Sequence, residues 1–431
     1  MKIAIVGSGI AGLTCAHLLD PHHDVTVFES SDRPGGHTNT VDVTLPDESG
    51  NPVSFAIDTG FIVFNERNYP NFIKLLERLD VPSQHSVMSF SVRSDATGLE
   101  YRGTNLNTLY AQRRNIPSLS FARMLIDIVR FNRAGRRVLD AGAEATAADD
   151  RTLRQFIERG RYSNRFREQF LIPLGASIWS ADPATFLDFP AATYFRFMDN
   201  HGLLELQGIP TWRTVTGGSR QYVRALTDRL DGEIRLATPV RSIRRTSDES
   251  RPLGTAVSID LADDSTEVFD AVILACHSDQ GLKLLGDPTP DETDVLANIR
   301  YQPNIATLHT DSRMLPRSAR ARASWNYHLD AGSATEATLT YWMNNLQSIE
   351  SPHEFLVTLN RPDEIDPDKV LAQFHYDHPV FDGPAITAQK RRSEIQGGRA
   401  TFFAGAYWGY GFHEDGVNSA LDVCDRFGIH L

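Results

Sequence analysis

Three glycines near the N-terminus have the spacing of a dinucleotide-binding turn. Gly7, Gly9 and Gly12 follow a short β-branched run at 3–6, and a helical pattern follows at 13–19. In such a strand–turn–helix unit the first glycine permits a tight turn and the second lets backbone N–H groups approach a pyrophosphate. The third glycine lets the helix pack closely on the strand. The segment therefore predicts a dinucleotide site.

An acidic residue lies at the position where a dinucleotide-binding unit uses a carboxylate to bind ribose. Glu29 ends a second predicted strand at 24–28, about 20 residues after the turn, where an acid binds the hydroxyls of the ribose. A second glycine pair, Gly35 and Gly36, follows within "SSDRPGGHTNT". A simple NAD unit does not include that pair, so the sequence favours another dinucleotide.

The segment "TFFAGAYWGYGFHEDGV", at 401–417, combines six aromatic residues with small residues and three polar ones. A surface tail would not contain so many rings, and a core strand would not contain so many small residues and charges. We interpret it as the wall of a site built around a flat molecule, with Gly405 allowing close approach of the backbone. A buried aromatic strand is the alternative.

Taken together, these segments resemble the flavin amine oxidase and phytoene desaturase superfamily. The stretch from Glu29 resembles its E-x-x-x-R-x-G-G-R motif, with Arg33 in place and His37 where the last arginine usually stands. "FAIDTGFIVF" resembles the D-x-G-x segment beside the flavin, "TVTGGSRQYVRALTDRL" the G-G-x-x-x-L motif, and 401–405 the final F-A-G motif. "ASWNY", "YWMN" and "HPVF" resemble a bacterial subgroup of predicted NAD/FAD-binding, amine-oxidase-like proteins.

The resemblance implies a monoamine-oxidase-like α/β fold. A discontinuous Rossmann-like FAD-binding domain, expected at 1–90, 212–285 and 390–431, is interleaved with an α+β substrate-binding domain at 91–211 and 286–389.

The resemblance also implies that FAD lies extended between the first glycine turn and the two flavin segments. The implied cofactor contacts are Gly7, Ser8, Gly9, Ala11, Gly12, Glu29, Ser30, Arg33, Gly35, Gly36, His37, Thr38, Asp58, Thr59, Gly60, Phe61, Val240, Gly405, Gly416 and Val417. The last helix is expected to start at Gly416 and Val417, with its N-terminus facing the flavin.

Three residues of the last segment are candidates for catalysis. Tyr407 is expected to shape the pocket, and His413 or Glu414 to transfer a proton. The alternative is that Glu414 or Asp415 caps the last helix. The acids and the histidine lack the spacing of a metal site, and no metal is expected.

Two departures from an amine oxidase bear on the reaction. No cysteine lies in the final motif, so FAD is expected to be non-covalent. Many flavin amine oxidases also hold a lysine near flavin N5, whereas this chain has no lysine between Lys283 and Lys369. That interval contains "RASWNYHL" and "TLTYWMNNLQ", which predict strands that either line a pocket or simply pack as a sheet.

These features favour hydride transfer from a hydrophobic, unsaturated, lipid-like substrate to flavin N5, as in a desaturase or a double-bond isomerase. The alternatives are an amine oxidase that forms imine and hydrogen peroxide, and a non-catalytic FAD-binding protein.

Composition limits the partners and the compartment. A net charge of −12 argues against nucleic acid as a partner. The three cysteines are far apart and show no disulfide or zinc spacing, which favours a reducing cytoplasm. No apolar run is long enough for a transmembrane helix.

One basic segment stands out in this acidic chain. Residues 113–137 contain seven arginines and one aspartate. The sequence predicts a helix with an apolar stripe, which would allow peripheral contact with the inner membrane face. A helix packed on the substrate domain is the alternative. The stripe consists of Phe121, Met124, Leu125, Ile128, Val129 and Phe131.

Overall fold

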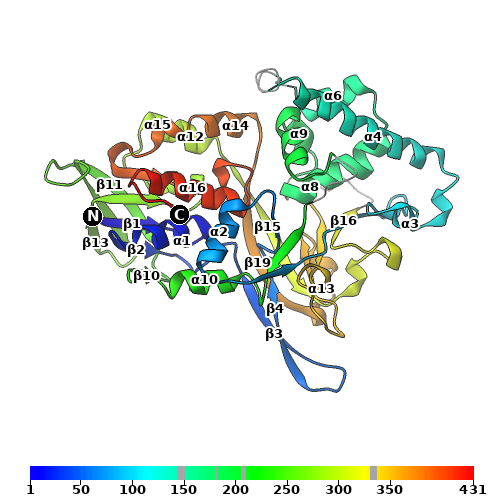
Figure 1. Ribbon diagram of the computed structural model, residues 1–431, viewed down its shortest axis with the longest axis horizontal. Helices are drawn as coiled ribbons and strands as arrows, with labels where there is room; N and C mark the ends of the chain where they lie inside the picture. Colours follow the sequence, from blue (N-terminus) through cyan, green and yellow to red (C-terminus); the bar gives the residue numbers. More distant parts are fainter. Residues whose placement is uncertain (143–148, 150, 180–181, 205–209, 331–336) are drawn as a thin grey trace.

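The protein has two lobes, each built around its own β-sheet, and both chain ends lie in the first lobe (Figure 1). This computed structural model describes the chain apart from residues 143–148, 150, 180–181, 205–209 and 331–336. We call the two parts the parallel-sheet lobe and the mixed-sheet lobe.

The parallel-sheet lobe has a five-stranded sheet in the order β10-β2-β1-β14-β20, in which all neighbours are parallel. Its central strands are almost wholly buried runs of β-branched and small residues, as strands covered on both faces require. The strand–turn–helix–strand expected at the N-terminus is present. The bounds are β1 Lys2–Val6, β2 Asp24–Phe28, β10 Glu233–Arg235, β14 Ala271–Leu274 and β20 Thr401–Phe403.

Helices cover this sheet and bring the two ends of the chain together. The first helix, α1, packs along the last, α16, and both lie beside the sheet in Figure 1. The helices are α1 Ile10–Leu19, α2 Pro70–Arg78, α10 Arg220–Thr227, α11 Ser278–Leu284, α12 Pro290–Ala297, α14 Gly383–Lys390, α15 Arg392–Ile395 and α16 His413–Asp425.

The packing of α12 and α14 differs from the expected domain boundaries. We expected 286–389 to belong wholly to the substrate-binding domain, yet Val295 and Leu296 of α12 and Ala388 of α14 lie in the core of the parallel-sheet lobe. Apolar periodicity predicts a helix but does not say which sheet the helix covers.

Smaller antiparallel units complete this side of the molecule. A turn between Ser247 and Thr255 connects β11 to β12, and a long ribbon of β3 and β4 projects from the molecule in Figure 1. The bounds are β3 Thr40–Pro46, β4 Pro52–Asp58, β5 Phe64–Asn65, β6 Ser83–His85, β9 Trp212–Val215, β11 Val240–Ser247, β12 Thr255–Leu261 and β13 Thr266–Phe269.

The mixed-sheet lobe has seven strands in the order β19-β15-β18-β17-β16-β7-β8, and only β16 and β7 run parallel. The two strands expected in the lysine-free interval are β16 and β17. The bounds are β7 Phe90–Ser94, β8 Glu100–Arg102, β15 Tyr301–His309, β16 Trp325–Leu329, β17 Leu339–Trp342, β18 Leu356–Leu359 and β19 Val370–Pro379.

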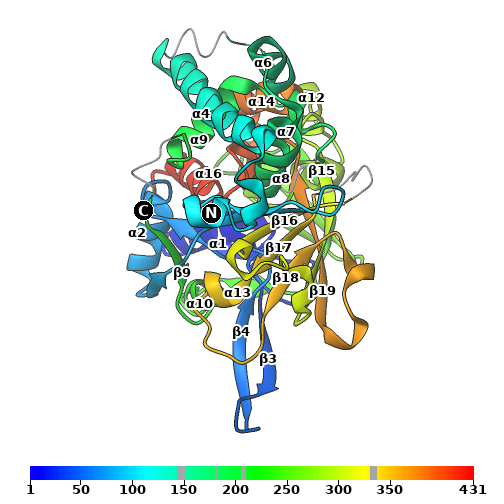
Figure 2. The same cartoon turned by 90° about the vertical axis from the view of Figure 1, so that its right-hand side faces the viewer.

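Most helices of this lobe gather on one side of its sheet, above the strands in Figure 2. They are α3 Leu106–Leu109, α4 Leu119–Asp140, α6 Leu153–Gly160, α7 Asn164–Phe166, α8 Ile172–Trp179 and α9 Ala191–Asn200, with α13 Met343–Leu346 apart from them. Among the described residues, no helix has the length and apolar character that a membrane span requires.

Candidate functional site

The first glycine turn leaves an open space at the N-terminus of α1. Gly7 has φ +105°, and a Cβ on Gly12 would lie 1.9 Å from the Gly7 carbonyl oxygen, so both positions need glycine. A Cβ on Gly9 would meet no atom within 4 Å. Gly9 caps α1 without a side-chain hydrogen bond, so the first N–H groups of α1 remain available. This cradle fits a pyrophosphate.

Glu29 lies beside this cradle at the end of β2. One carboxylate oxygen accepts hydrogen bonds from the Ser8 N–H at 2.9 Å and the Ser8 hydroxyl at 2.6 Å. The other accepts from the Ser31 N–H at 2.8 Å and from two hydroxyls, those of Ser31 at 2.9 Å and Ser30 at 3.3 Å. Burial opposes ionisation, but these donors outweigh it and lower the pKa of Glu29. Ribose hydroxyls could exchange with the serine hydroxyls on this carboxylate.

The second glycine turn packs directly on the first. Gly36 has φ +58°, and a Cβ on it would lie 3.1 Å from the Cα of Gly9. The Arg33 guanidinium donates to the backbone carbonyls of Thr38 at 3.0 Å and Gly36 at 2.9 Å. Arg33 thus stabilises the conformation of the turn. From the motif alone, its guanidinium group would be assigned to a contact with the cofactor.

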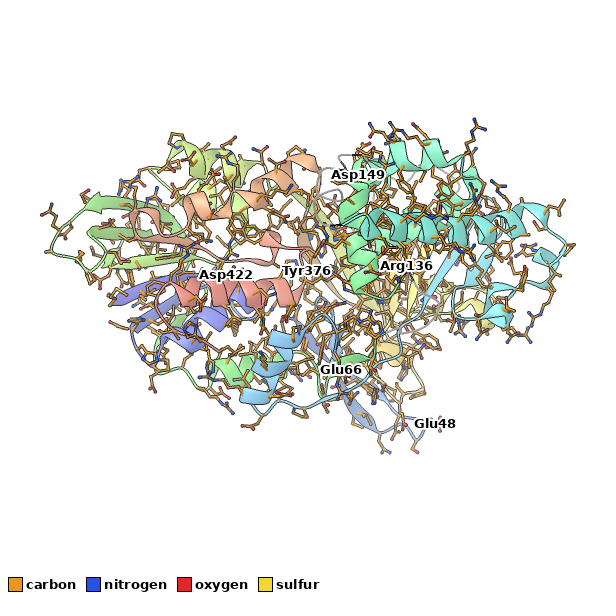
Figure 3. All side chains as sticks on the ribbon, turned by 45° about the horizontal axis from the view of Figure 1, so that its top comes forward. Glu48, Glu66, Arg136, Asp149, Tyr376 and Asp422 are labelled. Carbon is orange, nitrogen blue, oxygen red and sulfur yellow. The ribbon has the colours of Figure 1, made fainter. Side chains whose placement is uncertain are left out.

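His37 stands at this turn with one nitrogen unsatisfied. Its Nε2 is buried and has no hydrogen-bond partner. The rings of Tyr376, His378 and His277 lie 5.1, 5.4 and 6.0 Å away, and Figure 3 places Tyr376 between the lobes. Burial, followed by the neighbouring imidazoles, holds the pKa of His37 well below its usual range. A neutral imidazole with a free ring nitrogen is a group that a bound cofactor would satisfy.

Sequence reasoning missed the neighbours of His37. His277 follows β14, and His378 and Tyr376 belong to β19, so three distant segments meet here. "HPVF" contains His378, but nothing in its local pattern marks the residue as part of a site. Burial lowers the pKa of His378 to about 4, so this imidazole is also neutral at pH 7.

Asp58 forms hydrogen bonds with several segments that surround the site. Its buried carboxylate accepts from the Thr40 hydroxyl at 2.6 Å, the Ser219 N–H at 2.9 Å and hydroxyl at 2.7 Å, and the Gln347 amide at 3.0 Å. Burial raises its pKa to about 6 against the effect of these donors. All the donors come from the protein, so this carboxylate joins β4, the turn before α10 and the residue after α13.

The next three residues form close contacts at the base of the site. The Thr59 hydroxyl lies 2.8 Å from that of Tyr376, and a Cβ on Gly60 would lie 2.1 Å from the His37 carbonyl oxygen. The Phe61 ring stacks on His413 with centroids 3.5 Å apart.

The last helix begins earlier than expected. It starts at His413 because Asp415 accepts the N–H groups of Phe412 at 3.0 Å and Tyr410 at 3.1 Å, which closes a cap. The expectation that Gly416 and Val417 start the helix is therefore wrong. Both lie inside it, and a Cβ on Gly416 would lie 2.7 Å from the Ile10 side chain.

Two hydroxyl groups and a stacked ring fix the position of the His413 side chain. Its Nε2 lies 3.0 Å from the Thr38 hydroxyl and 2.9 Å from the Tyr222 hydroxyl, and Phe61 covers its ring. Burial lowers its pKa to about 3, so it is neutral at pH 7. A proton on Nε2 could pass only to these two hydroxyls unless the ring moves.

Glu414 caps a different helix. Its two carboxylate oxygens accept the N–H groups of Asn71 at 3.0 Å and Phe72 at 2.8 Å in the first turn of α2. Within "HEDG", the three polar residues thus serve three separate sites.

We expect Glu414→Gln to lower the free energy of unfolding by about 1–2 kcal/mol, because α2 loses a charged cap. Flavin reduction per folded molecule should be unchanged. Urea unfolding and anaerobic flavin reduction measure the two effects. The matched control is Glu77→Gln, the same change at an exposed position on α2. Normal stability with lost turnover would instead assign Glu414 to proton transfer.

The rings of the C-terminal segment divide between the two lobes. Tyr407 lies in the core of the parallel-sheet lobe, where its ring would lie 2.2 Å from a Cβ on Gly405. The rings of Tyr410 and Phe412 instead pack on Phe197 of α9, each with centroids 5.4 Å apart. Only Tyr410 and Phe412 therefore face the lobe expected to bind substrate, and Tyr407 does not.

The amides of β16 and of α13, the helix that directly follows β17, form hydrogen bonds with the backbone. Asn326 donates to the Ala323 and Thr340 carbonyls at 2.6 and 3.2 Å, and Asn344 accepts the Phe355 N–H at 2.7 Å. These contacts favour the packed-sheet alternative for both residues. Val240 begins β11 opposite Leu261.

Comparison with known proteins places this geometry in context. Residues 10–374 match the family described as "Flavin containing amine oxidoreductase". The "Putative flavin-containing monoamine oxidase AofH" of Mycobacterium tuberculosis is 28% identical over 256 residues, which are 57% of this chain and 52% of AofH. The chain thus spans about half the length of these curated relatives.

Solved structures share the whole fold. Cyclohexylamine oxidase from Brevibacterium oxydans IH-35A has a TM-score of 0.68 at 16% identity, over 99% of both chains. A CLA-producing fatty acid isomerase from P. acnes has a TM-score of 0.65 at 16% identity, over 99% of this chain and 98% of that chain. The expected monoamine-oxidase-like fold is confirmed.

Proposed function

Because the chain belongs to the family of flavin containing amine oxidoreductases, we propose that it is an FAD-dependent oxidoreductase acting on a hydrophobic, unsaturated, lipid-like substrate. The resemblance expected from the motifs is confirmed, and the family implies a flavin cofactor. The substrate class is the proposal, and it rests on the charges at the flavin end of the site.

The residues present fit an extended FAD. The N–H groups at the start of α1 would hold the pyrophosphate, Glu29 the ribose, and the turn at Gly36 and His37 the adjoining part of the cofactor. When bound, the cofactor supplies a hydride acceptor. The chain contributes by orienting the substrate and excluding water.

The hydrogen bonds already made by the described carboxylates at this end are the observation that supports the lipid-like substrate. Among the described residues at this end, Asp58 and Glu414 have both carboxylate oxygens occupied by donors, and Asp415 accepts the N–H groups of Tyr410 and Phe412 on one oxygen. To pair with Asp58 or Glu414, an ammonium group would have to displace these protein donors. A buried cation without a partner is costly, whereas an apolar chain is not.

The aromatic contacts agree with this proposal. Tyr410, Phe412 and Phe197 form an apolar group where the last helix meets α9. His37, His378 and His413 add only neutral imidazoles.

We also propose that FAD is held without a covalent bond. Cys276 follows β14 beside the first glycine turn, where its N–H nitrogen would lie 3.2 Å from a Cβ on Gly7. Burial raises the pKa of its thiol to about 12, so it is not a thiolate nucleophile. Cys15 and Cys424 are buried between α1 and α16. Denaturation should therefore release all the flavin.

The test is anaerobic mixing of the holoprotein with unsaturated fatty acids, chain-matched saturated ones, and amines such as cyclohexylamine and putrescine. We expect unsaturated chains to bleach the flavin band or to return with a moved double bond, detected by gas chromatography. Bleaching reports transfer of electrons to the flavin, a moved double bond reports isomerisation, and a saturated chain should give neither.

The similarity to AofH makes amine oxidation the second candidate. Bleaching by amines alone, with peroxide released in air, would establish that candidate and overturn the lipid-like substrate. Bound flavin that neither class reduces or transforms would favour a non-catalytic role.

A further inference from the structure

Exposed apolar side chains gather on one short part of the chain. Half of the exposed large apolar residues in the described ranges lie between residues 106 and 129. Leu119, at the first position of α4, is 87% exposed. Single exposed leucines are ordinary, but a contiguous group marks an interaction surface. The group consists of Leu106, Ile116, Leu119, Ile126 and Val129.

The segment after α3 packs on the start of α4, which places the two parts of this group near each other. Tyr110, directly after α3, packs on Phe121 in the first turn of α4, with centroids 5.4 Å apart. In Figure 1 both helices lie at the end of the molecule farthest from the chain termini, and Figure 2 views that end.

The outward face of α4 differs from the stripe expected from the sequence. Phe121, Met124 and Phe131 are buried in the core of the mixed-sheet lobe, so most of the expected stripe is the inner face. The outer face instead presents Leu119 and Ile126, seven residues apart and therefore aligned on the helix. The side chains of this outer face do not belong to the core of the mixed-sheet lobe.

Arginines without acidic partners surround these side chains. Arg113 donates to the Asn107 and Tyr110 carbonyls at 3.2 and 2.8 Å, and Arg114 donates to the Gly98 carbonyl at 2.6 Å. Arg133 and Arg137 are exposed, and within the described ranges neither has a carboxylate partner. Four cations thus remain uncompensated on a protein of net charge −12.

We propose that this face binds an anionic phospholipid membrane, with α4 lying along the interface. Protruding leucine and isoleucine side chains suit the acyl boundary, and flanking guanidinium groups suit phosphate headgroups. The contact is peripheral, since none of the described helices can span a membrane. We name this face the docking surface, made of Leu106, Ile116, Leu119, Ile126 and Val129 with Arg113, Arg114, Arg133 and Arg137.

The test uses the holoprotein and sedimentation with vesicles of phosphatidylcholine, with or without phosphatidylglycerol. We expect binding only where phosphatidylglycerol is present, and weaker binding as salt rises. Removing two cations, in Arg133→Gln/Arg137→Gln, should lower the affinity about 25-fold, at about fivefold for each charge. Leu119→Ser/Ile126→Ser should lower it at least about tenfold.

Matched controls lie on the other lobe. Leu253→Ser removes a leucine that is 42% exposed, and Arg241→Gln removes an arginine paired with Asp264 at 2.5 Å. Both should bind vesicles like the unaltered protein, and all variants should retain flavin. Equal binding by docking-surface variants and controls, or no binding to anionic vesicles at low salt, would overturn the proposal. A dimer in solution that Leu119→Ser disrupts would instead assign this face to a second copy of the chain.

Discussion

Gly9→Ala should yield a folded protein that no longer retains FAD. Gly9 has φ −68°, which alanine adopts readily, and its Cβ would meet no protein atom within 4 Å. The folded apoprotein should therefore lose at most about 1 kcal/mol, the cost of alanine at a helix cap. If the open space is where the pyrophosphate binds, the methyl group blocks the N–H groups of α1. FAD affinity should fall roughly a hundredfold, or about 2.7 kcal/mol.

Titration of the apoprotein with FAD measures the affinity, and urea unfolding of the apoprotein measures the stability. The contrasting variant is Gly12→Ala, two residues into the same helix. Its Cβ would lie 1.9 Å from the Gly7 carbonyl oxygen, so the fold itself should lose about 3 kcal/mol. Unaltered FAD affinity in Gly9→Ala would place the pyrophosphate elsewhere.

Asp58→Ala should be among the most destabilising single changes in the chain. It removes the acceptor for the Thr40 hydroxyl, both Ser219 donors and the Gln347 amide, all buried. Unsatisfied buried donors cost about 1–3 kcal/mol each, and relaxation recovers part of that. We expect a loss of about 4 kcal/mol in the free energy of unfolding, with weaker docking of α13 on β4.

Two variants distinguish the loss of buried hydrogen bonds from the general effect of removing an aspartate. Asp58→Asn keeps the shape and one acceptor but directs an N–H₂ group at other donors, so it should lose about half as much. Asp263→Ala, in an exposed turn where the carboxylate accepts from Ser265, should lose at most about 1 kcal/mol. If Asp58→Ala lowered the free energy of unfolding as little as Asp263→Ala, the hydrogen bonds of Asp58 would not hold the two lobes together.

The local parts of this site could be predicted from the sequence, because their physics is local. The turn from Gly7 to Gly12 and the acid at Glu29 belong to one continuous strand–turn–helix–strand unit, and the structure shows that unit. The glycines before α10 were predictable for the same reason.

Long-range contacts could not be predicted. Glu414 caps α2, whose first turn lies more than 340 residues earlier, and Gln347 reaches Asp58 across 289 residues. His37, His277 and His378 meet only because β19 and the end of β14 converge on the second glycine turn. The sequence did not show which apolar side chains of α4 face the core, because the outer face of this helix is also partly apolar. Periodicity alone does not distinguish the two faces.

The strand order of the parallel sheet has a consequence for synthesis of the chain. Strands β1 and β2 are made first, but β14 and β20, which complete the sheet on their other side, come from residues 271–274 and 401–403. At ribosomal speeds of about 5–20 residues per second, β1 waits tens of seconds for its second neighbour. Its exposed backbone edge and the apolar face of α1 must be shielded during that time. Nascent chains released before residue 401 should therefore aggregate or bind chaperones, even though they contain the complete first glycine turn.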